Sequence, residues 1–273
     1  MKESKSTKSK PIRIKKKGHI AWVILDNPEK RNAMTFDFFL QMIEVFADLD
    51  DDTEIRVAII KGEGKSFTAG IDLMSLAGLT QSTGADSREN LRRVILKGQQ
   101  SNTAVIQCRK PVICAIHGHC IGGGVDLICA CDIRLASKDT IFSVRETKLG
   151  VIADLGTIQR LPDIVGEPWA RELIFTGRDF TATKALDLGL ITHMYETPEK
   201  LFEAAQKLAC EIADNSPLTV MGAKDTMRFT RENTIQASLE YVAQKNAAQL
   251  MNEDLMEAIT ALMEKRKPIF KGK

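Results

Sequence analysis

The sequence predicts an α/β domain with a largely parallel sheet, followed by a helical C-terminal region. In the first half, short β-branched runs alternate with helix-period segments in the order strand, helix, strand, helix, strand. That alternation is typical of right-handed βαβ units, whose strands lie parallel in one sheet. From Thr157 onward strand patterns almost vanish. The 273 residues, 44% of them hydrophobic, suffice for one large core.

Three strands and two helices are expected in the first half. The strands are apolar and rich in β-branched residues, as buried strands of parallel sheets are, and they cover residues 19–25, 55–60 and 111–116. The helices repeat apolar residues every three to four positions and cover residues 91–108 and, from a Thr35 cap, the segment through Asp51. Residues 80–89 are predicted to form a mobile polar loop.

The second half is expected to be mainly helical. Three or four helices are predicted over residues 198–265, after short strands at residues 132–136, 141–144 and 191–194. We therefore divide the chain into a basic N-terminal arm (1–10), an α/β core (11–200) and a C-terminal helical region (201–273).

Basic residues crowd the first 17 positions, although the net charge is only +2. We interpret this run as a solvated, disordered arm; its members are Lys2, Lys5, Lys8, Lys10, Arg13, Lys15, Lys16 and Lys17. A mitochondrial transit peptide is the alternative, but almost no apolar residue precedes Ile12 to form an amphipathic helix. The near-neutral balance argues against nucleic acid as the main partner.

Compartment and membrane contact follow from the cysteines and the hydropathy. None of the six cysteines forms a CxxC pair, so we expect buried free thiols in a reducing compartment, the cytoplasm or an organelle matrix. The chain ends Lys-Gly-Lys and not in a peroxisomal Ser-Lys-Leu signal. No apolar run reaches the ~18 residues of a membrane span, and we expect no membrane association.

A glycine-rich turn follows the third predicted strand, at Gly118–Asp126. Three consecutive glycines let the backbone approach a ligand closely, and a helix starting there would point free N–H groups at the same place. Such a turn suits an anion or a developing oxyanion; a tight packing turn is the alternative. The spacing matches neither a Rossmann fingerprint nor a P-loop.

A second small-residue turn, Ser66–Leu73, follows the second predicted strand. Ligands of open α/β sheets bind at the carboxyl ends of strands. Two such turns on neighbouring strands could each donate one N–H to a carbonyl oxygen.

Three carboxylates are candidates for proton transfer: Asp126, Glu146 and Asp154. The last two flank a mostly apolar segment, and apolar surroundings raise carboxyl pKa values toward neutrality. Helix caps or salt-bridge partners are the alternative for each. His117 and His119 lack a third ligand at a recognised spacing, so no metal site is expected. No serine stands in a GxSxG elbow.

Together these segments resemble the crotonase (enoyl-CoA hydratase/isomerase) superfamily, over residues 12–267. The matching motifs, in the family's order and spacing, are Asp26–Pro28, Arg31–Met34, Ala69–Leu73, Gly122–Asp126, Ala130–Arg134 and Gly156–Pro162. The resemblance implies a crotonase-like spiral of ββα turns with a C-terminal helical trimerisation region, as a homotrimer or a homohexamer built from two trimers.

The resemblance also implies an acyl-CoA substrate, no cofactor beyond the coenzyme A in that substrate, and an oxyanion hole. The backbone N–H groups of Ile71 and Gly123 would bind the thioester carbonyl. The implied substrate-binding positions are Arg31, Ala33, Ala69, Gly70, Asp72, Leu73, Gly122 and Gly124.

The carboxylates separate the subfamilies. The set Asp126, Glu146 and Asp154 is similar to that of the dienoyl-CoA isomerases, in which two acids would act at opposite ends of the diene while Asp126 assists. An enoyl- or dienoyl-CoA hydratase is the alternative. A non-catalytic scaffold or RNA-binding member, with its arm on polyanions, is a third. Apolar residues that could line the acyl pocket are Leu76, Leu79, Val94, Ile95 and Leu96.

Overall fold

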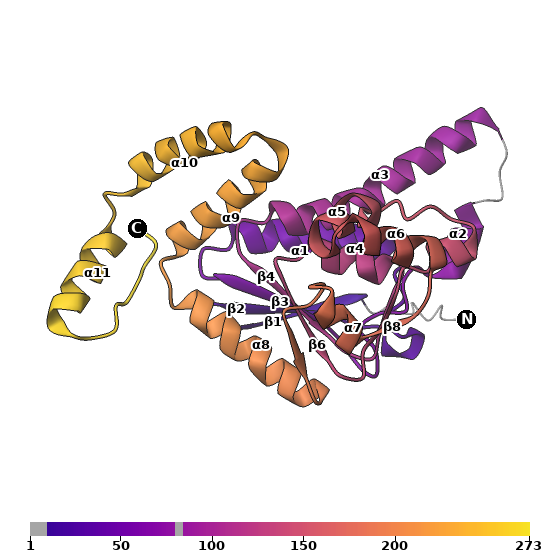
Figure 1. The fold of residues 1–273 in the computed structure, drawn as a ribbon, viewed down its shortest axis with the longest axis horizontal. Coiled ribbons are helices and arrows are strands. Elements are labelled where there is room, and N and C mark those ends of the chain that lie inside the picture. Colours follow the sequence, from indigo (N-terminus) through magenta and orange to yellow (C-terminus); the bar gives the residue numbers. More distant parts are fainter. Residues whose placement is uncertain (1–9, 80–83) are drawn as a thin grey trace, which may run out of the picture.

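The computed structural model describes residues 10–79 and 84–273, and its centre is a six-stranded sheet (Figure 1). The strand order is β1-β2-β3-β4-β6-β9. All neighbouring pairs are parallel except β1 with β2. The strands are β1 (Ile12–Lys17), β2 (Ile20–Leu25), β3 (Val57–Gly62), β4 (Val112–Ile116), β6 (Ile133–Ser137) and β9 (His193–Tyr195). The predicted α/β class with a largely parallel sheet is confirmed.

A second, three-stranded sheet turns the chain into a spiral. It contains β5 (His119–Ile121), β7 (Ile141–Ser143) and β8 (Phe180–Thr181) in that order. The chain passes from β4 through β5 to helix α4 (Gly123–Ala130), and then from β6 through β7 toward helix α5 (Thr157–Val165). Each turn is therefore a ββα unit, with one strand in each sheet.

Helices cover both faces of the main sheet. One face packs against α1 (Phe36–Asp51), α3 (Ala85–Gln107), α4 and α5, and the other against α8 (Pro198–Ala213) (Figure 1). Strand β3 supplies Ala58 and Ile60 to the first core and Val57 and Ile59 to the second. Burial on both faces explains why its sequence is a continuous apolar run and not an alternating one.

The remaining helices are short or belong to the C-terminal helical region. They are η1 (Pro28–Lys30), α2 (Leu73–Leu79), η2 (Glu146–Leu149), α6 (Glu167–Thr176), α7 (Ala182–Asp187), α9 (Pro217–Glu232), α10 (Ile235–Gln249) and α11 (Glu253–Glu264). The last three extend away from the sheet (Figure 1). The predicted cap of α1 is also observed, because Thr35 Oγ1 accepts a hydrogen bond from the Phe38 N–H at 3.3 Å.

Two expectations are corrected. The basic run was expected to be disordered, but Ile12–Lys17 forms β1, because Ile12 is buried while charged neighbours point outward. Arg13 pairs with Asp26 at 2.7 Å and Lys16 with Asp52 at 2.6 Å. Such charges also protect an edge strand from pairing with other chains. Residues 1–9 of the predicted arm lie outside the described residues.

The predicted loop at residues 80–89 is wrong for its second half. Helix α3 already begins at Ala85, and its first turns are stabilised by Glu89, which pairs with Arg92 and Arg93 at 2.8 and 3.1 Å. Residues 80–83 lie outside the described residues. In the part of the chain that is described, no helix is both long and apolar enough to cross a membrane.

Candidate active site

A cavity of about 600 Å³ collects most of the predicted site residues. Both small-residue turns and all three carboxylates line it. The predicted residues on its wall are Ala69, Gly70, Ile71, Leu73, Gly122, Gly123, Asp126, Glu146 and Asp154. Four other predicted positions do not line the cavity: Arg31, Ala33, Asp72 and Gly124.

The glycine turn works as the start of helix α4. Gly122 has φ 52° and ψ −117°, which a residue with a side chain rarely adopts, and its N–H donates to the Ser143 carbonyl at 2.8 Å. Gly124 permits close packing, because a Cβ there would lie 2.5 Å from Thr68 Cγ2. The backbone N–H of Gly123 is left at the cavity wall.

The second turn contacts the first. Gly70 has φ 89°, and a Cβ on it would lie 2.6 Å from the Ile121 carbonyl oxygen, so only glycine fits. Met34 fixes the turn on its other side: its N–H donates to the Gly70 carbonyl at 2.8 Å. Its carbonyl accepts from the Asp72 N–H at 2.9 Å.

Two backbone N–H groups remain available where the turns meet. Neither the Ile71 N–H nor the Gly123 N–H donates to any described residue. They are close together, since a Cβ built on Gly123 would lie 3.9 Å from the Ile71 nitrogen. A pair of free, rigidly held donors at a cavity wall can stabilise negative charge that develops on a carbonyl oxygen.

Asn32 supports this turn from behind, and sequence reasoning did not select it. Its buried side-chain amide donates to the carbonyls of Glu63, Ser66 and Phe67 at 2.9, 2.8 and 3.1 Å. Its backbone has φ 55°, a left-handed conformation that asparagine tolerates better than most residues. The neighbouring Arg31 contributes its carbonyl, which accepts from the Ala69 N–H at 2.9 Å.

Asn32→Ala is expected to lower the free energy of unfolding by about 2–4 kcal/mol, because two buried carbonyls and one partly buried carbonyl lose a donor. Urea denaturation would measure this. The matched control is Asn215→Ala, which removes an exposed amide that donates to the Glu211 carbonyl at 3.1 Å and should change stability by less than about 0.5 kcal/mol. Equal losses in the two variants would contradict the role assigned to Asn32.

Asp126 is the most buried of the three acids, with 1% of its surface exposed. Its Oδ1 accepts a 2.6 Å hydrogen bond from the Thr157 N–H, at the amino-terminal end of α5. Burial raises the pKa of Asp126 to about 6, against the hydrogen bonding from Thr157, which favours the charged form.

Glu146 lies beside the glycine turn, at the start of η2. Its Oε1 would be 3.1 Å from a Cβ on Gly122. Its Oε2 is buried and has no hydrogen-bond partner among the described residues. Burial, followed by the charge of Asp126, raises the pKa of Glu146 to about 7. A carboxyl with that pKa is half ionised at neutral pH and can take up or release a proton.

Asp154 reaches the cavity from the loop before α5. Its backbone carbonyl accepts a 2.8 Å hydrogen bond from Gln99 Nε2 on α3, and burial raises the pKa of its carboxyl. Three elements thus bring three acids to one cavity. Because Asp126 and Asp154 both raise the pKa of Glu146, protons on the three groups are coupled.

Glu146→Gln is expected to stabilise the protein at pH 8. A folded-state pKa of about 7 lies above the unfolded value of 4.5, so the folded state holds its proton longer as pH rises. Its stability therefore falls between about pH 4 and 7, by up to about 3 kcal/mol for this group. Thermal unfolding of the variant and the wild type should give the variant a higher melting temperature at pH 8 and an equal one near pH 4.

The exposed Glu196→Gln variant serves as the control, since that side chain pairs with Lys138 at the surface. Glu196→Gln should show no pH-dependent gain in stability over the wild type. A Glu146→Gln advantage of equal size at pH 4 and pH 8 would contradict the raised pKa.

Apolar side chains form the rest of the cavity wall. Of the predicted acyl-pocket residues, Val94 and Ile95 line the cavity, whereas Leu96 on the same helix is absent from its wall and 41% exposed. The side chains of Leu76 and Leu79 lie outside the described residues. Further apolar lining residues, which sequence reasoning did not select, are Phe36, Phe39, Leu91, Leu149, Val151, Ile152 and Leu155.

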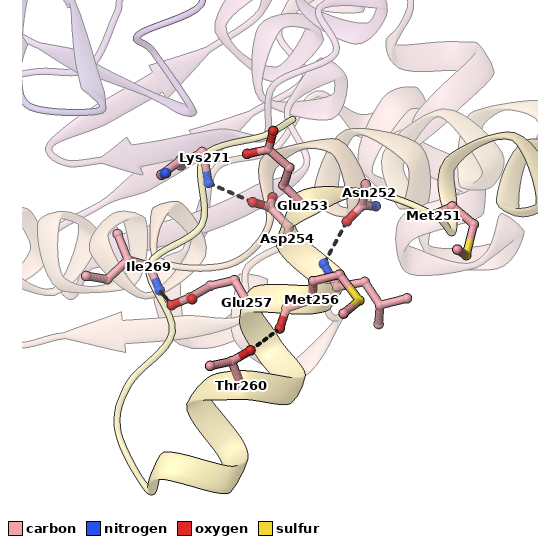
Figure 2. Close-up of a pocket in the computed structure, with 10 residues that line it drawn as sticks. Met251, Asn252, Glu253, Asp254, Met256, Glu257, Thr260, Ile269 and Lys271 are labelled. Atoms are coloured by element: carbon pink, nitrogen blue, oxygen red, sulfur yellow. Dashed lines mark hydrogen bonds between the residues drawn. The ribbon is translucent and has the colours of Figure 1, made fainter.

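Another hollow, of about 560 Å³, lies on α11 and the C-terminal tail (Figure 2). Its polar groups already serve the local fold. Asn252 caps α11 by accepting from the Leu255 N–H at 2.7 Å. Asp254 and Glu257 accept from the tail N–H groups of Lys271 and Ile269 at 2.7 and 2.8 Å. We therefore assign the chemistry to the first cavity. Over residues 10–79 and 84–273, no group of three His, Cys, Asp or Glu side chains could hold a metal ion.

Comparison with known proteins agrees with this geometry. The family model described as enoyl-CoA hydratase/isomerase matches residues 15–273. A relative named peroxisomal Delta(3,5)-Delta(2,4)-dienoyl-CoA isomerase, from Arabidopsis thaliana, is 46% identical over 91% of each chain. A mitochondrial enzyme of that name from Dictyostelium discoideum is 44% identical over 98% of this chain and 93% of its own.

A solved structure, the enoyl-CoA hydratase of Bacillus anthracis, superposes with a TM-score of 0.90 at 29% identity, over 96% of this chain and 100% of the other. The likeness therefore extends over the spiral and the C-terminal helices. This chain belongs to the enoyl-CoA hydratase/isomerase family, the crotonase superfamily.

Proposed function

We propose that the protein is an isomerase that converts a 3,5-dienoyl-CoA into a 2,4-dienoyl-CoA. The observation that carries the proposal is the placement of three acids, two of them with pKa values raised to about 6 and 7, around a cavity beside two free N–H donors. Relatives that bear the dienoyl-CoA isomerase name support the substrate class.

The reaction begins with removal of a proton from C2, next to the thioester. The Ile71 and Gly123 N–H groups would donate to the thioester oxygen and stabilise the enolate that forms. Electrons then shift along the conjugated chain, and a proton is added at C6. The double bonds move from C3 and C5 to C2 and C4, with no net gain or loss of atoms.

The positions of the acids suggest their roles. Glu146, beside Gly122 and next to the oxyanion donors, is placed to take the C2 proton. Asp154 reaches the cavity from the α3 side, near the apolar wall, and would return a proton at C6. Asp126 would stay ionised and raise the proton affinity of Glu146.

The remaining predicted positions would shape the substrate site. Ala69, Gly70 and Leu73 line the cavity at the turn after β3, and Gly122 lines it at the glycine turn before α4. Arg31, Ala33, Asp72 and Gly124 would act from behind, by holding these turns. Asp72 does so by capping α2, because its Oδ1 accepts from the Ser75 N–H at 2.9 Å. The proposed chemistry uses no cofactor other than the coenzyme A of the substrate.

We also propose a trimer or a dimer of trimers, assembled through the helical region from residue 201. Exposed apolar side chains on α9 to α11 support this assembly, and those more than 70% exposed are Met227, Ile235, Leu262 and Met263. A cytoplasmic or organelle-matrix location is proposed from the cysteines, all of which are free. The relatives above are named peroxisomal and mitochondrial.

Purified protein should be incubated with a 3,5-dienoyl-CoA while the ultraviolet band of the conjugated 2,4-dienoyl thioester is followed. We expect the band to grow. A 2-enoyl-CoA is run in parallel, because a hydratase would consume it by adding water and its absorbance would fall. Loss of the 2-enoyl absorbance, with no growth of the dienoyl band, would replace the isomerase proposal with the hydratase alternative.

A further inference from the structure

The loop that carries Asp154 is held from two sides through its backbone. From α3, Gln99 Nε2 donates to the Asp154 carbonyl at 2.8 Å and Asn102 Nδ2 to the Leu155 carbonyl at 3.1 Å. From α5, Arg160 Nη1 donates to the same Leu155 carbonyl at 3.2 Å. The Leu155 carbonyl, one residue after Asp154, is therefore bonded to both α3 and α5.

Gly156 makes room for the arginine. A Cβ built on Gly156 would lie only 1.6 Å from Arg160 Nη1 and 2.6 Å from Cζ, so the guanidinium occupies the space that a side chain would need. The glycine also has φ 123°, a conformation that other residues rarely adopt. The Arg160 guanidinium therefore packs directly against the loop backbone at Gly156.

The guanidinium is half-buried and lies within electrostatic reach of the acid set. The groups that act on it electrostatically are Asp126 and Cys129 on α4 and Arg231 on α9. Burial lowers the pKa of Arg160, but guanidinium remains a cation under all ordinary conditions. The charge of Arg160 acts on Asp126 in the direction that favours the carboxylate, whereas Asp154 acts in the opposite direction.

We propose that Arg160 is a positioning residue that holds the Asp154–Gly156 loop, and with it the Asp154 carboxyl, in place at the cavity. The inference rests on the proposed function for its effect on rate, but not for its effect on the carboxyl groups. Arg160 does not line the cavity, so it acts through the acids and not on the substrate.

Arg160→Ala should lower kcat on the order of 10- to 100-fold, with a smaller change in KM, because the Asp154 loop loses its anchor. Loss of the anchor should also expose the Asp154 carboxyl, whose pKa is raised by burial. The Asp154 titration followed by ¹³C NMR should therefore move to lower pH. Added guanidinium ion should restore part of the rate.

Two further variants separate charge from hydrogen bonding. Arg160→Lys keeps the charge but not the planar donor, so it should lower kcat and shift the Asp154 titration much as Arg160→Ala does. Gly156→Ala displaces the guanidinium and should reproduce the titration shift with Arg160 still present. The control is Arg171→Ala on α6, an exposed residue that pairs with Glu167 and should change neither readout.

The proposal is overturned if Arg160→Ala folds normally and keeps the wild-type Asp154 titration. It is also overturned if the rate falls with no shift in the Asp154 titration and no guanidinium rescue, since that would be a structural role only. If the wild-type enzyme does not isomerise 3,5-dienoyl-CoA, the proposed function fails, while the Asp154 titration still decides the role of Arg160.

Discussion

Asp154→Asn is expected to lower kcat for 3,5-dienoyl-CoA by about 10²- to 10⁴-fold, the usual contribution of a positioned acid or base. Asparagine keeps the shape of the side chain but cannot exchange a proton. KM should change much less, because the Ile71 and Gly123 donors and the apolar wall remain. The measurement is a steady-state assay on the dienoyl absorbance.

Glu146→Gln should give a loss of similar size, and the double variant should lose little more than either single one. Residues that act in one relay are not additive, because the first substitution already stops it. The matched control is Asp163→Asn, an exposed acid on α5 with no part in the cavity. A single variant with more than about half of the wild-type kcat would contradict the assignment of that acid.

Gly70→Ala is expected to lower kcat by about 10²- to 10³-fold, the typical loss when one oxyanion donor is removed. The added Cβ would lie 2.6 Å from the Ile121 carbonyl oxygen, so the turn must shift and carry the Ile71 N–H away from the Gly123 N–H. The strained φ of 89° adds to this displacement.

Gly84→Ala provides the control for a glycine-to-alanine change. Gly84 has an ordinary φ of −73°, and beyond the adjacent residues the nearest described atom to a Cβ there would be Ser87 Oγ, at 3.9 Å. Its activity should match the wild type. If Gly70→Ala is folded and fully active, the first turn does not supply an oxyanion donor.

The strands and helices that the sequence predicts well are those with strong local patterns. The apolar run of β3 and the Thr35-capped helix α1 carry their own signals, and each is found within about two residues of its predicted bounds. Strand β5 has only three residues and no pattern of its own, and it was missed. Strand β1 was missed because four of its six residues are charged, which obscures the two isoleucines that face inward.

The site residues also divide into those that a local sequence pattern reveals and those that it does not. Glycine turns can be located from sequence because their strained backbones require glycine, as at Gly70 and Gly122. The supporting contacts cannot. Asn32 looks like any polar loop residue until three carbonyls converge on its amide, and Arg160 looks like a surface cation until Gly156 is seen beneath it. Such roles depend on approaches between distant segments that no local pattern encodes.

The most direct test of the two-acid account is to run the reaction in D₂O and locate deuterium in the 2,4-dienoyl-CoA by NMR and mass spectrometry. In this account Glu146 removes the C2 proton and a different group, Asp154, donates a proton to C6. The Asp154 proton exchanges with solvent deuterium before turnover. The account predicts one deuterium at C6. A product that carries no deuterium, because one carboxylate moved the substrate's own proton from C2 to C6, would contradict it.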